Sequence, residues 1–230
     1  MKTVCVIQHT EAEYLGLMED HLEGRNIRFT YYRPFTHGGT LPSGIEDFDG
    51  LMLLGGGPYG VVSGHLLPSM MPELRLTRAF LAAGLPVTGF ELGAVLLAVA
   101  AGGGAEEAPL RFQVERVTSS DGNAILSNLP MASYLRDRPV LPRDAKILGH
   151  DGQGEPLVYS LAQNCLGFLG HPGMKRGMAE DLIMEFAETP ENTVESLEAL
   201  GLVQREIADR LSELMVWLVA QAGLMDSADA

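Results

Sequence analysis

Short apolar runs alternate with helix-like stretches through the N-terminal part of this chain, and this alternation constrains the fold more than any other feature. Apolar runs predict strands at residues 4–8, 27–33, 50–54 and 85–90, and amphipathic stretches predict helices at 14–23, 70–83 and 93–101. Strands that alternate with helices form βαβ units, and right-handed crossovers place such helices on both faces of a parallel sheet. The sequence therefore predicts an α/β fold with a flavodoxin-like, mostly parallel central sheet.

The pattern changes after Gly102. Strand-like runs at 111–118, 145–149, 157–161 and 165–169 are joined by turn signals, which predicts a small antiparallel addition to one side of the sheet. Residues 175–187 and 191–224 return to a helical pattern, and Gly201 leaves open a break within the second. We expect one α/β domain over residues 1–190 and a C-terminal helical extension over 191–230.

The composition excludes several classes of protein. The chain has 230 residues, 46% of them hydrophobic and 20% charged, which are values of a compact globular protein. Its formal net charge of -14 disfavours nucleic acid and anionic membrane surfaces as partners. No apolar stretch is long enough to span a membrane, and the run at 4–7 is too short for a signal peptide. Cys5 and Cys165 lie in apolar runs typical of reduced, buried strand residues, so we expect a soluble cytoplasmic protein.

Residues 85–98 have the pattern of a nucleophile elbow, in which a buried strand turns sharply into a helix. Gly89 and Gly93 frame Glu91, as glycines frame the nucleophile in the G-x-S-x-G turn of hydrolases. The amides and the dipole at the start of the helix favour a negative charge there. Glutamate is nevertheless a poor acyl acceptor, because its attack on an amide would form a mixed anhydride. The elbow therefore predicts that this chain is not a working cysteine- or serine-dependent hydrolase.

Four segments in order along the chain resemble the class I glutamine amidotransferase domain, in particular the glutaminase half of GMP synthase. They are residues 6–9, the strand and Gly-Gly-Pro turn at 48–58, the elbow and its helix at 82–98, and Gly170-His171-Pro172. The resemblance, which extends to about residue 187, implies a thiol that attacks the glutamine carboxamide and a histidine that activates it. It also implies an acid that orients the histidine, backbone amides that bind the oxyanion, and release of ammonia to a synthetase partner.

The side chains that the resemblance assigns to catalysis have largely changed. Glu91 stands at the nucleophile position, Val95 at the position of a glutamine-contacting Gln, and Gly173 at the position of the orienting acid, while His171 is kept. The backbone positions of the oxyanion site correspond to Gly56, Gly57 and Leu92. Because the nucleophile, the substrate contact and the orienting acid have all changed, we expect no glutaminase activity.

The residues leave open what the site now does. His171 either pairs with Glu91, which would raise the pKa of the histidine, or is kept by packing alone. The turn at 55–57 either cradles an anion or is a tight turn and no more. The other histidines show no ligand spacing, so we expect neither a metal nor a cofactor.

The C-terminal segment 191–224 carries an apolar stripe that includes Leu211, Leu214, Trp217 and Leu218. This stripe either packs on its own domain or forms an interface, and we favour a homodimer or partner interface because the segment is long. The first functional hypothesis is a binding, regulatory or scaffold subunit that works with a synthetase or another protein. The alternative is a repurposed enzyme in which Glu91 and His171 act as acid and base on a small anionic metabolite.

Overall fold

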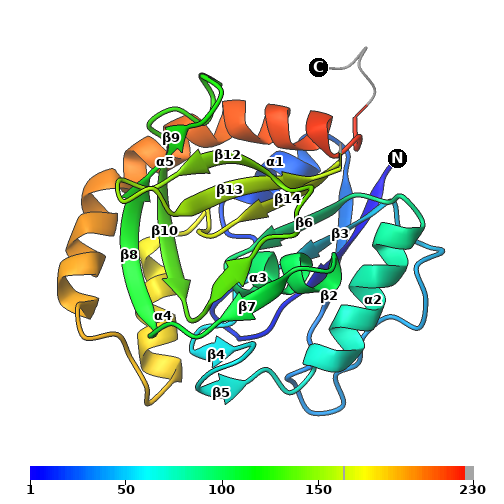
Figure 1. Cartoon of the computed structure of the whole chain (residues 1–230), viewed down its shortest axis with the longest axis horizontal. Coiled ribbons are helices and arrows are strands. Elements are labelled where there is room, and N and C mark those ends of the chain that lie inside the picture. Colours follow the sequence, from blue (N-terminus) through cyan, green and yellow to red (C-terminus); the bar gives the residue numbers. More distant parts are fainter. Residues whose placement is uncertain (163, 226–230) are drawn as a thin grey trace.

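The computed structural model describes residues 1–162 and 164–225. Its centre is an eight-stranded sheet with the strand order β2-β1-β3-β6-β14-β13-β12-β9 (Figure 1). The pairs from β2 to β14 are parallel, and the pairs from β14 to β9 are antiparallel. The strands of this sheet are β1 (Thr3–Ile7), β2 (Arg28–Tyr32), β3 (Gly50–Leu53), β6 (Val87–Phe90), β9 (Thr118–Ser119), β12 (Lys146–His150), β13 (Pro156–Leu161) and β14 (Cys165–Phe168).

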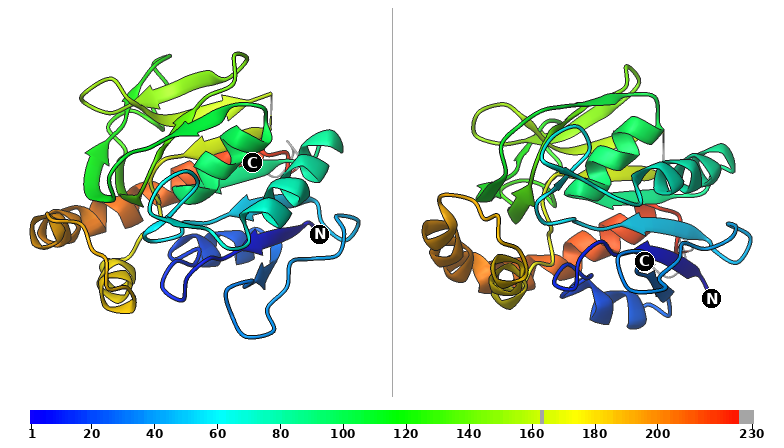
Figure 2. Two further views of the ribbon diagram at one scale, coloured as in Figure 1. Left: turned by 60° about the horizontal axis from the view of Figure 1, so that its bottom comes forward. Right: turned by 90° about the horizontal axis from the view of Figure 1, so that it is seen from below.

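Helices cover both faces of the sheet. In the right-hand view of Figure 2, α2 and α3 lie on one side of the sheet, and α1 and α5 lie on the other. The helices are α1 (Met18–Glu23), α2 (Met70–Ala82), α3 (Leu92–Ala100), α4 (Arg176–Glu185) and α5 (Thr193–Gln221). The predicted fold class, with its parallel sheet, antiparallel addition and C-terminal helix, is confirmed.

Three two-stranded sheets flank the central one. They are the pairs β8 (Arg111–Arg116) with β10 (Pro130–Leu135), β7 (Gly104–Glu106) with β11 (Arg138–Val140), and β4 (Tyr59–Gly60) with β5 (His65–Leu66). Strand β10 was not predicted from the sequence, although all six of its residues are buried. Its sequence begins with proline and contains small and polar residues, so it shows neither alternation nor a β-branched run.

The C-terminal helix is continuous through Gly201 and buries its stripe on its own domain. Leu211, Leu214 and Leu218 are at most 1% exposed and belong to the main hydrophobic core. Gly201 lies on the exposed side, where a Cβ would sit 3.0 Å from Arg176 Nη1, and the packed face outweighs the low helix propensity of glycine. The break that the sequence leaves open at Gly201 therefore does not occur in α5. The homodimer stays a prediction, but the apolar stripe no longer supports it.

The first helix begins at Met18 and is therefore shorter than the helix predicted over 14–23. Residues 14–17 instead cross over the segment after β14, where the Leu17 amide donates to the Gly173 carbonyl at 3.1 Å. Gly16 permits this path with a φ of +64°. Tertiary contacts have thus replaced a helical turn with a covering segment.

Both cysteines are free and buried, Cys5 in β1 and Cys165 in β14, as the apolar runs predict. Burial raises the pKa of the Cys5 thiol to about 12 and also raises that of Cys165, so both thiols stay protonated and poorly reactive. Among the described residues, no helix combines the length and the apolar composition that a membrane span requires.

Candidate functional site at the elbow

The predicted elbow is present at the junction of β6 and α3. Glu91 stands between them with φ +51° and ψ -115°, a backbone conformation that costs a non-glycine residue on the order of 1–3 kcal/mol. The glycines beside it permit close approach of the chain to itself. A Cβ on Gly89 would lie 2.4 Å from the Gly93 carbonyl oxygen, and a Cβ on Gly93 would lie 2.1 Å from the Leu53 carbonyl oxygen.

The Glu91 carboxyl group is fully buried, whereas a working nucleophile has to be reached by its substrate. Its Oε1 atom accepts a hydrogen bond from the Tyr134 amide of β10 at 2.6 Å. Its Oε2 atom faces Glu13, a residue for which the sequence carries no site signal. A Cβ on Gly55 would lie 2.1 Å from Glu13 Oε1 and 2.5 Å from Glu91 Oε2, so the two oxygens converge above this glycine.

Glu13 Oε1 and Glu91 Oε2 have no hydrogen-bond donor among the described residues. A carboxylate has no proton to donate, so a hydrogen bond between the two carboxyl groups would require that one of the pair is protonated. Burial, reinforced by the charge of Glu13, raises the pKa of Glu91 well above its ordinary value. Burial likewise raises the pKa of Glu13 to about 7, although the bonds from Glu91 and the Gly57 amide oppose this shift. Both shifts favour a protonated carboxyl group in the pair.

The predicted oxyanion turn holds a carboxyl oxygen of the chain itself. The Gly57 amide donates to Glu13 Oε2 at 2.5 Å, from a backbone with φ +52°. The Leu92 side chain lies over Gly56, where a Cβ would come within 2.1 Å of Leu92 Cδ2. Gly56, Gly57 and Leu92 thus lie together beside Glu91, and Glu13 accepts from the Gly57 amide of this turn.

A third buried acid, Glu73, pairs with His9 next to this site. His9 Nε2 lies 2.7 Å from Glu73 Oε2, and His9 Nδ1 lies 2.9 Å from the Gly55 carbonyl oxygen. Burial disfavours the charged imidazole, but the charge and hydrogen bond of Glu73 outweigh it and raise the pKa of His9. Oxygen partners at both nitrogens favour the imidazolium form of His9. Sequence spacing gave no signal for this pair, because α2 brings Glu73 to the end of β1 only in the folded chain.

His171 lies beside the elbow, but its ring is bonded to backbone groups and not to Glu91. Nε2 lies 2.8 Å from the Tyr14 carbonyl oxygen, and Nδ1 accepts a hydrogen bond from the Gly173 amide at 3.2 Å. Burial lowers the pKa of His171 to about 4, so the ring is neutral. Of the two alternatives that the sequence leaves open for His171, these contacts and the lowered pKa favour retention by packing over a pair with Glu91. No carboxylate among the described residues forms an ion pair with this ring.

Val95 and Gly173, which stand where the resemblance places a substrate contact and an orienting acid, are packed tightly against their neighbours. Val95 is fully buried in α3 and belongs to the main hydrophobic core. A Cβ on Gly173 would lie 2.9 Å from Met18 Cγ and 3.2 Å from the Leu15 carbonyl oxygen. A longer side chain at position 173 would displace the segment that covers His171.

Two further residues that were not predicted from the sequence hold the loop between β3 and α2 against β10. The buried carboxylate of Asp137 accepts from the amides of Val61 and Val62 at 2.7 and 2.9 Å. Arg136, only 8% exposed, donates from Nε to the Pro58 carbonyl oxygen and pairs with Glu188. Asp137 and Arg136 thereby fix the loop that carries Gly57 at the residues that follow this glycine.

Comparisons with known proteins agree with this architecture. No protein-family model and no curated protein matches the sequence. A solved glutamine amidotransferase from Methylobacillus flagellatus is similar over 96% of this chain and 95% of its own, with a TM-score of 0.79 and 23% identity. A glutamine amidotransferase from Thermotoga maritima is similar over 96% of both chains, with a TM-score of 0.72 and 23% identity.

A third solved structure, described as a subunit of GMP synthase from Thermoplasma acidophilum, has 15% identity and a TM-score of 0.57. The match covers 89% of this chain and 98% of that one. At these identities the likeness establishes the fold. This chain therefore has the fold of glutamine amidotransferases, with Glu91 at its elbow.

Proposed function

We propose that this protein is a non-glutaminase member of the amidotransferase fold, which serves as a binding, regulatory or scaffold subunit. The observation that carries the proposal is the filled site. The carboxyl groups of Glu91 and Glu13 occupy the elbow and the anion position of the Gly57 amide, and both are fully buried. A substrate carbonyl has neither a nucleophile nor a free amide of Gly57 to approach.

The chemistry of the retained histidine supports this proposal. A general base needs a free nitrogen within hydrogen-bond reach of the proton that it abstracts. Both nitrogens of His171 are engaged with the backbone of Tyr14 and Gly173, and the ring is 0% exposed. The same contacts count against a repurposed acid–base enzyme, since Glu91 and His171 have separate partners and neither reaches solvent.

A synthetase or another protein is the partner that we propose. A similar solved structure is described as a subunit of GMP synthase, which gives this fold a role inside an assembly. The acidic surface, with a net charge of -14, favours partners that present basic surfaces.

The test is ammonia release from glutamine by the purified full chain. We expect none above the rate of a heat-denatured sample, because loss of the thiol removes several orders of magnitude in rate. Glu91→Cys alone should also release none, since Glu13 would still occupy the Gly57 amide and His171 would still bond to Tyr14. Clear turnover by the wild-type protein would overturn the proposal. Circular dichroism of the variant would verify that it is folded.

A further inference from the structure

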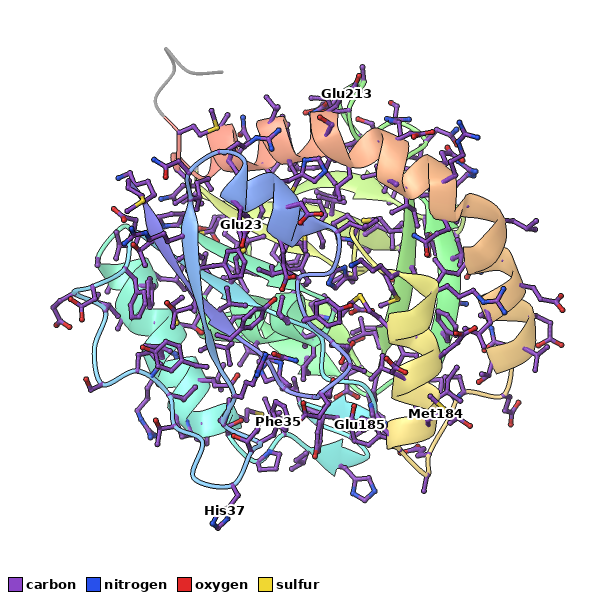
Figure 3. All side chains as sticks on the ribbon, turned by 180° about the vertical axis from the view of Figure 1, so that it is seen from behind. Glu23, Phe35, His37, Met184, Glu185 and Glu213 are labelled. Atoms are coloured by element: carbon purple, nitrogen blue, oxygen red, sulfur yellow. The ribbon has the colours of Figure 1, made fainter. Side chains whose placement is uncertain are left out.

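Residues 10–17, here called the cover segment, connect β1 to the start of α1 and lie over the elbow. Hydrogen bonds donated by backbone amides hold its two ends. The Glu11 and Ala12 amides donate to the carboxylate of Glu185, in the last turn of α4 (Figure 3), and the Leu17 amide donates to the Gly173 carbonyl. Between these ends, Glu13 is the side chain that reaches the Gly57 amide and Glu91.

Few donors serve the two carboxyl groups. Glu91 accepts from the Tyr134 amide, and Glu13 accepts from the Gly57 amide and, at 3.4 Å, from the Thr10 hydroxyl. Among the described residues, no N–H or O–H group donates to Glu13 Oε1 or Glu91 Oε2, the two oxygens that face each other. A proton between these oxygens satisfies both, whereas its loss leaves two carboxylates in contact inside the protein.

The charged groups around the pair do not neutralise it. His9, at the end of β1, favours an ionised Glu13, but it is already paired with Glu73 of α2. Glu185 of α4 acts in the opposite direction on Glu13. The buried Tyr134 hydroxyl of β10 and the neutral ring of His171 supply no positive charge.

We propose that Glu13 and Glu91 share one proton, and that this proton latches the cover segment over the elbow. When rising pH removes it, the two carboxylates repel each other, Glu13 leaves the Gly57 amide, and the cover segment opens. Opening would also withdraw the Tyr14 carbonyl from His171 and let solvent reach the elbow. This latch does not depend on whether the elbow catalyses a reaction, so it stands apart from the absence of glutaminase activity.

Hydrogen exchange of single amides, measured by NMR on the full chain, tests the latch. The reporters are the amides of Leu17, Gly57 and Tyr134, corrected for the intrinsic pH dependence of exchange. Between about pH 5 and about pH 8, we expect their opening constant to rise by up to about tenfold per pH unit, because opening releases one proton. The amide of Leu54, which bonds to the Ile7 carbonyl within the sheet, should show no such rise.

Glu13→Gln and Glu91→Gln should each abolish the rise. In either variant the new amide donates to the remaining carboxylate and its oxygen accepts the backbone amide, so the contact persists without a titrating proton. Glu11→Gln is the matched control, because Glu11 lies on the same segment but is exposed, and it should keep the wild-type rise. A wild-type opening constant that does not change with pH, or an unchanged slope in both variants, would overturn the proposal.

A second measurement on the wild-type protein covers the case in which a variant fails to fold. The side-chain carboxyl ¹³C shifts of Glu13 and Glu91 should report at least one proton retained at neutral pH. If both carboxyls titrate below about pH 5, as ordinary glutamates do, the shared proton is ruled out.

Discussion

Two of the buried acidic sites close to the elbow, Asp137 and the pair Glu13 and Glu91, are stabilised in opposite ways. Asp137 is surrounded by donors: its carboxylate accepts from the amides of Val61, Val62, Ser63 and Ala108 and from the Ser63 hydroxyl. Glu13 and Glu91 have few donors and are placed against each other. Hydrogen bonds replace the lost hydration of the first site, whereas the second leaves Glu13 Oε1 and Glu91 Oε2 without a donor among the described residues.

The difference assigns the two sites different roles. A carboxyl group that accepts several hydrogen bonds fixes a loop, so Asp137 is a clamp on residues 61–63. A carboxyl pair that depends on one proton responds to pH. The loop beside the elbow is therefore held by the fixed contacts of Asp137, whereas the contact between Glu13 and Glu91 changes with protonation.

The largest effect is expected when the clamp is removed. Asp137→Ala leaves the Val61 amide and the Ser63 hydroxyl buried without their acceptor and also removes the acceptor of the half-exposed Val62 amide. It should lower the free energy of unfolding by about 4 kcal/mol. Urea denaturation measures this loss. Asp144→Ala, at an exposed position, is the control and should change stability by less than about 0.5 kcal/mol. A loss below about 1 kcal/mol for Asp137→Ala would contradict the role of the clamp.

An intermediate effect should appear as a pH-dependent difference between Glu13→Gln and the wild type. A raised folded-state pKa gives stability that is fully present below the ordinary value of 4.5 and is lost as pH rises toward the folded value, about 7 for Glu13. The wild type should therefore lose up to about 3 kcal/mol relative to the variant across this window. Urea denaturation of both proteins at matched pH measures it. His171 titrates in both proteins and cancels, whereas the pKa of His9, which the Glu13 charge helps to raise, is lower in the variant. Parallel pH profiles would argue against the shared proton.

The smallest effect is expected from crowding the pair. Gly55→Ala would place a methyl group 2.1 Å from Glu13 Oε1 and 2.5 Å from Glu91 Oε2, which forces the carboxyl groups apart. We expect a loss of about 2 kcal/mol in unfolding free energy and faster exchange at the Gly57 amide. Gly122→Ala tests glycine replacement where no atom lies within 4 Å of the new Cβ, although its φ of +76° adds some strain. Unchanged exchange at Gly57 would show that the pair tolerates separation.

The local sequence pattern predicted most of the fold. Alternating strands and helices gave the parallel sheet, and the glycines around Glu91 gave the elbow, because both depend on residues that are neighbours in the chain. The pattern failed where tertiary contacts override local preference. Residues 14–17 leave the predicted helix to cover His171 and Gly173, and β10 forms from a run without strand periodicity because it is buried against β8 and the elbow.

The candidate site was predictable only in part, for the same reason. The sequence alone determined that Glu91 stands at the elbow and that Gly56, Gly57 and Leu92 lie beside it. The tertiary structure decided what Glu91 contacts, because Glu13 and Tyr134 come from distant parts of the chain. A carboxyl group takes its protonation from burial and from the donors within reach, and neither can be obtained from sequence spacing. Whether this elbow holds an exposed acid or a buried, proton-sharing pair was therefore a property of the folded molecule.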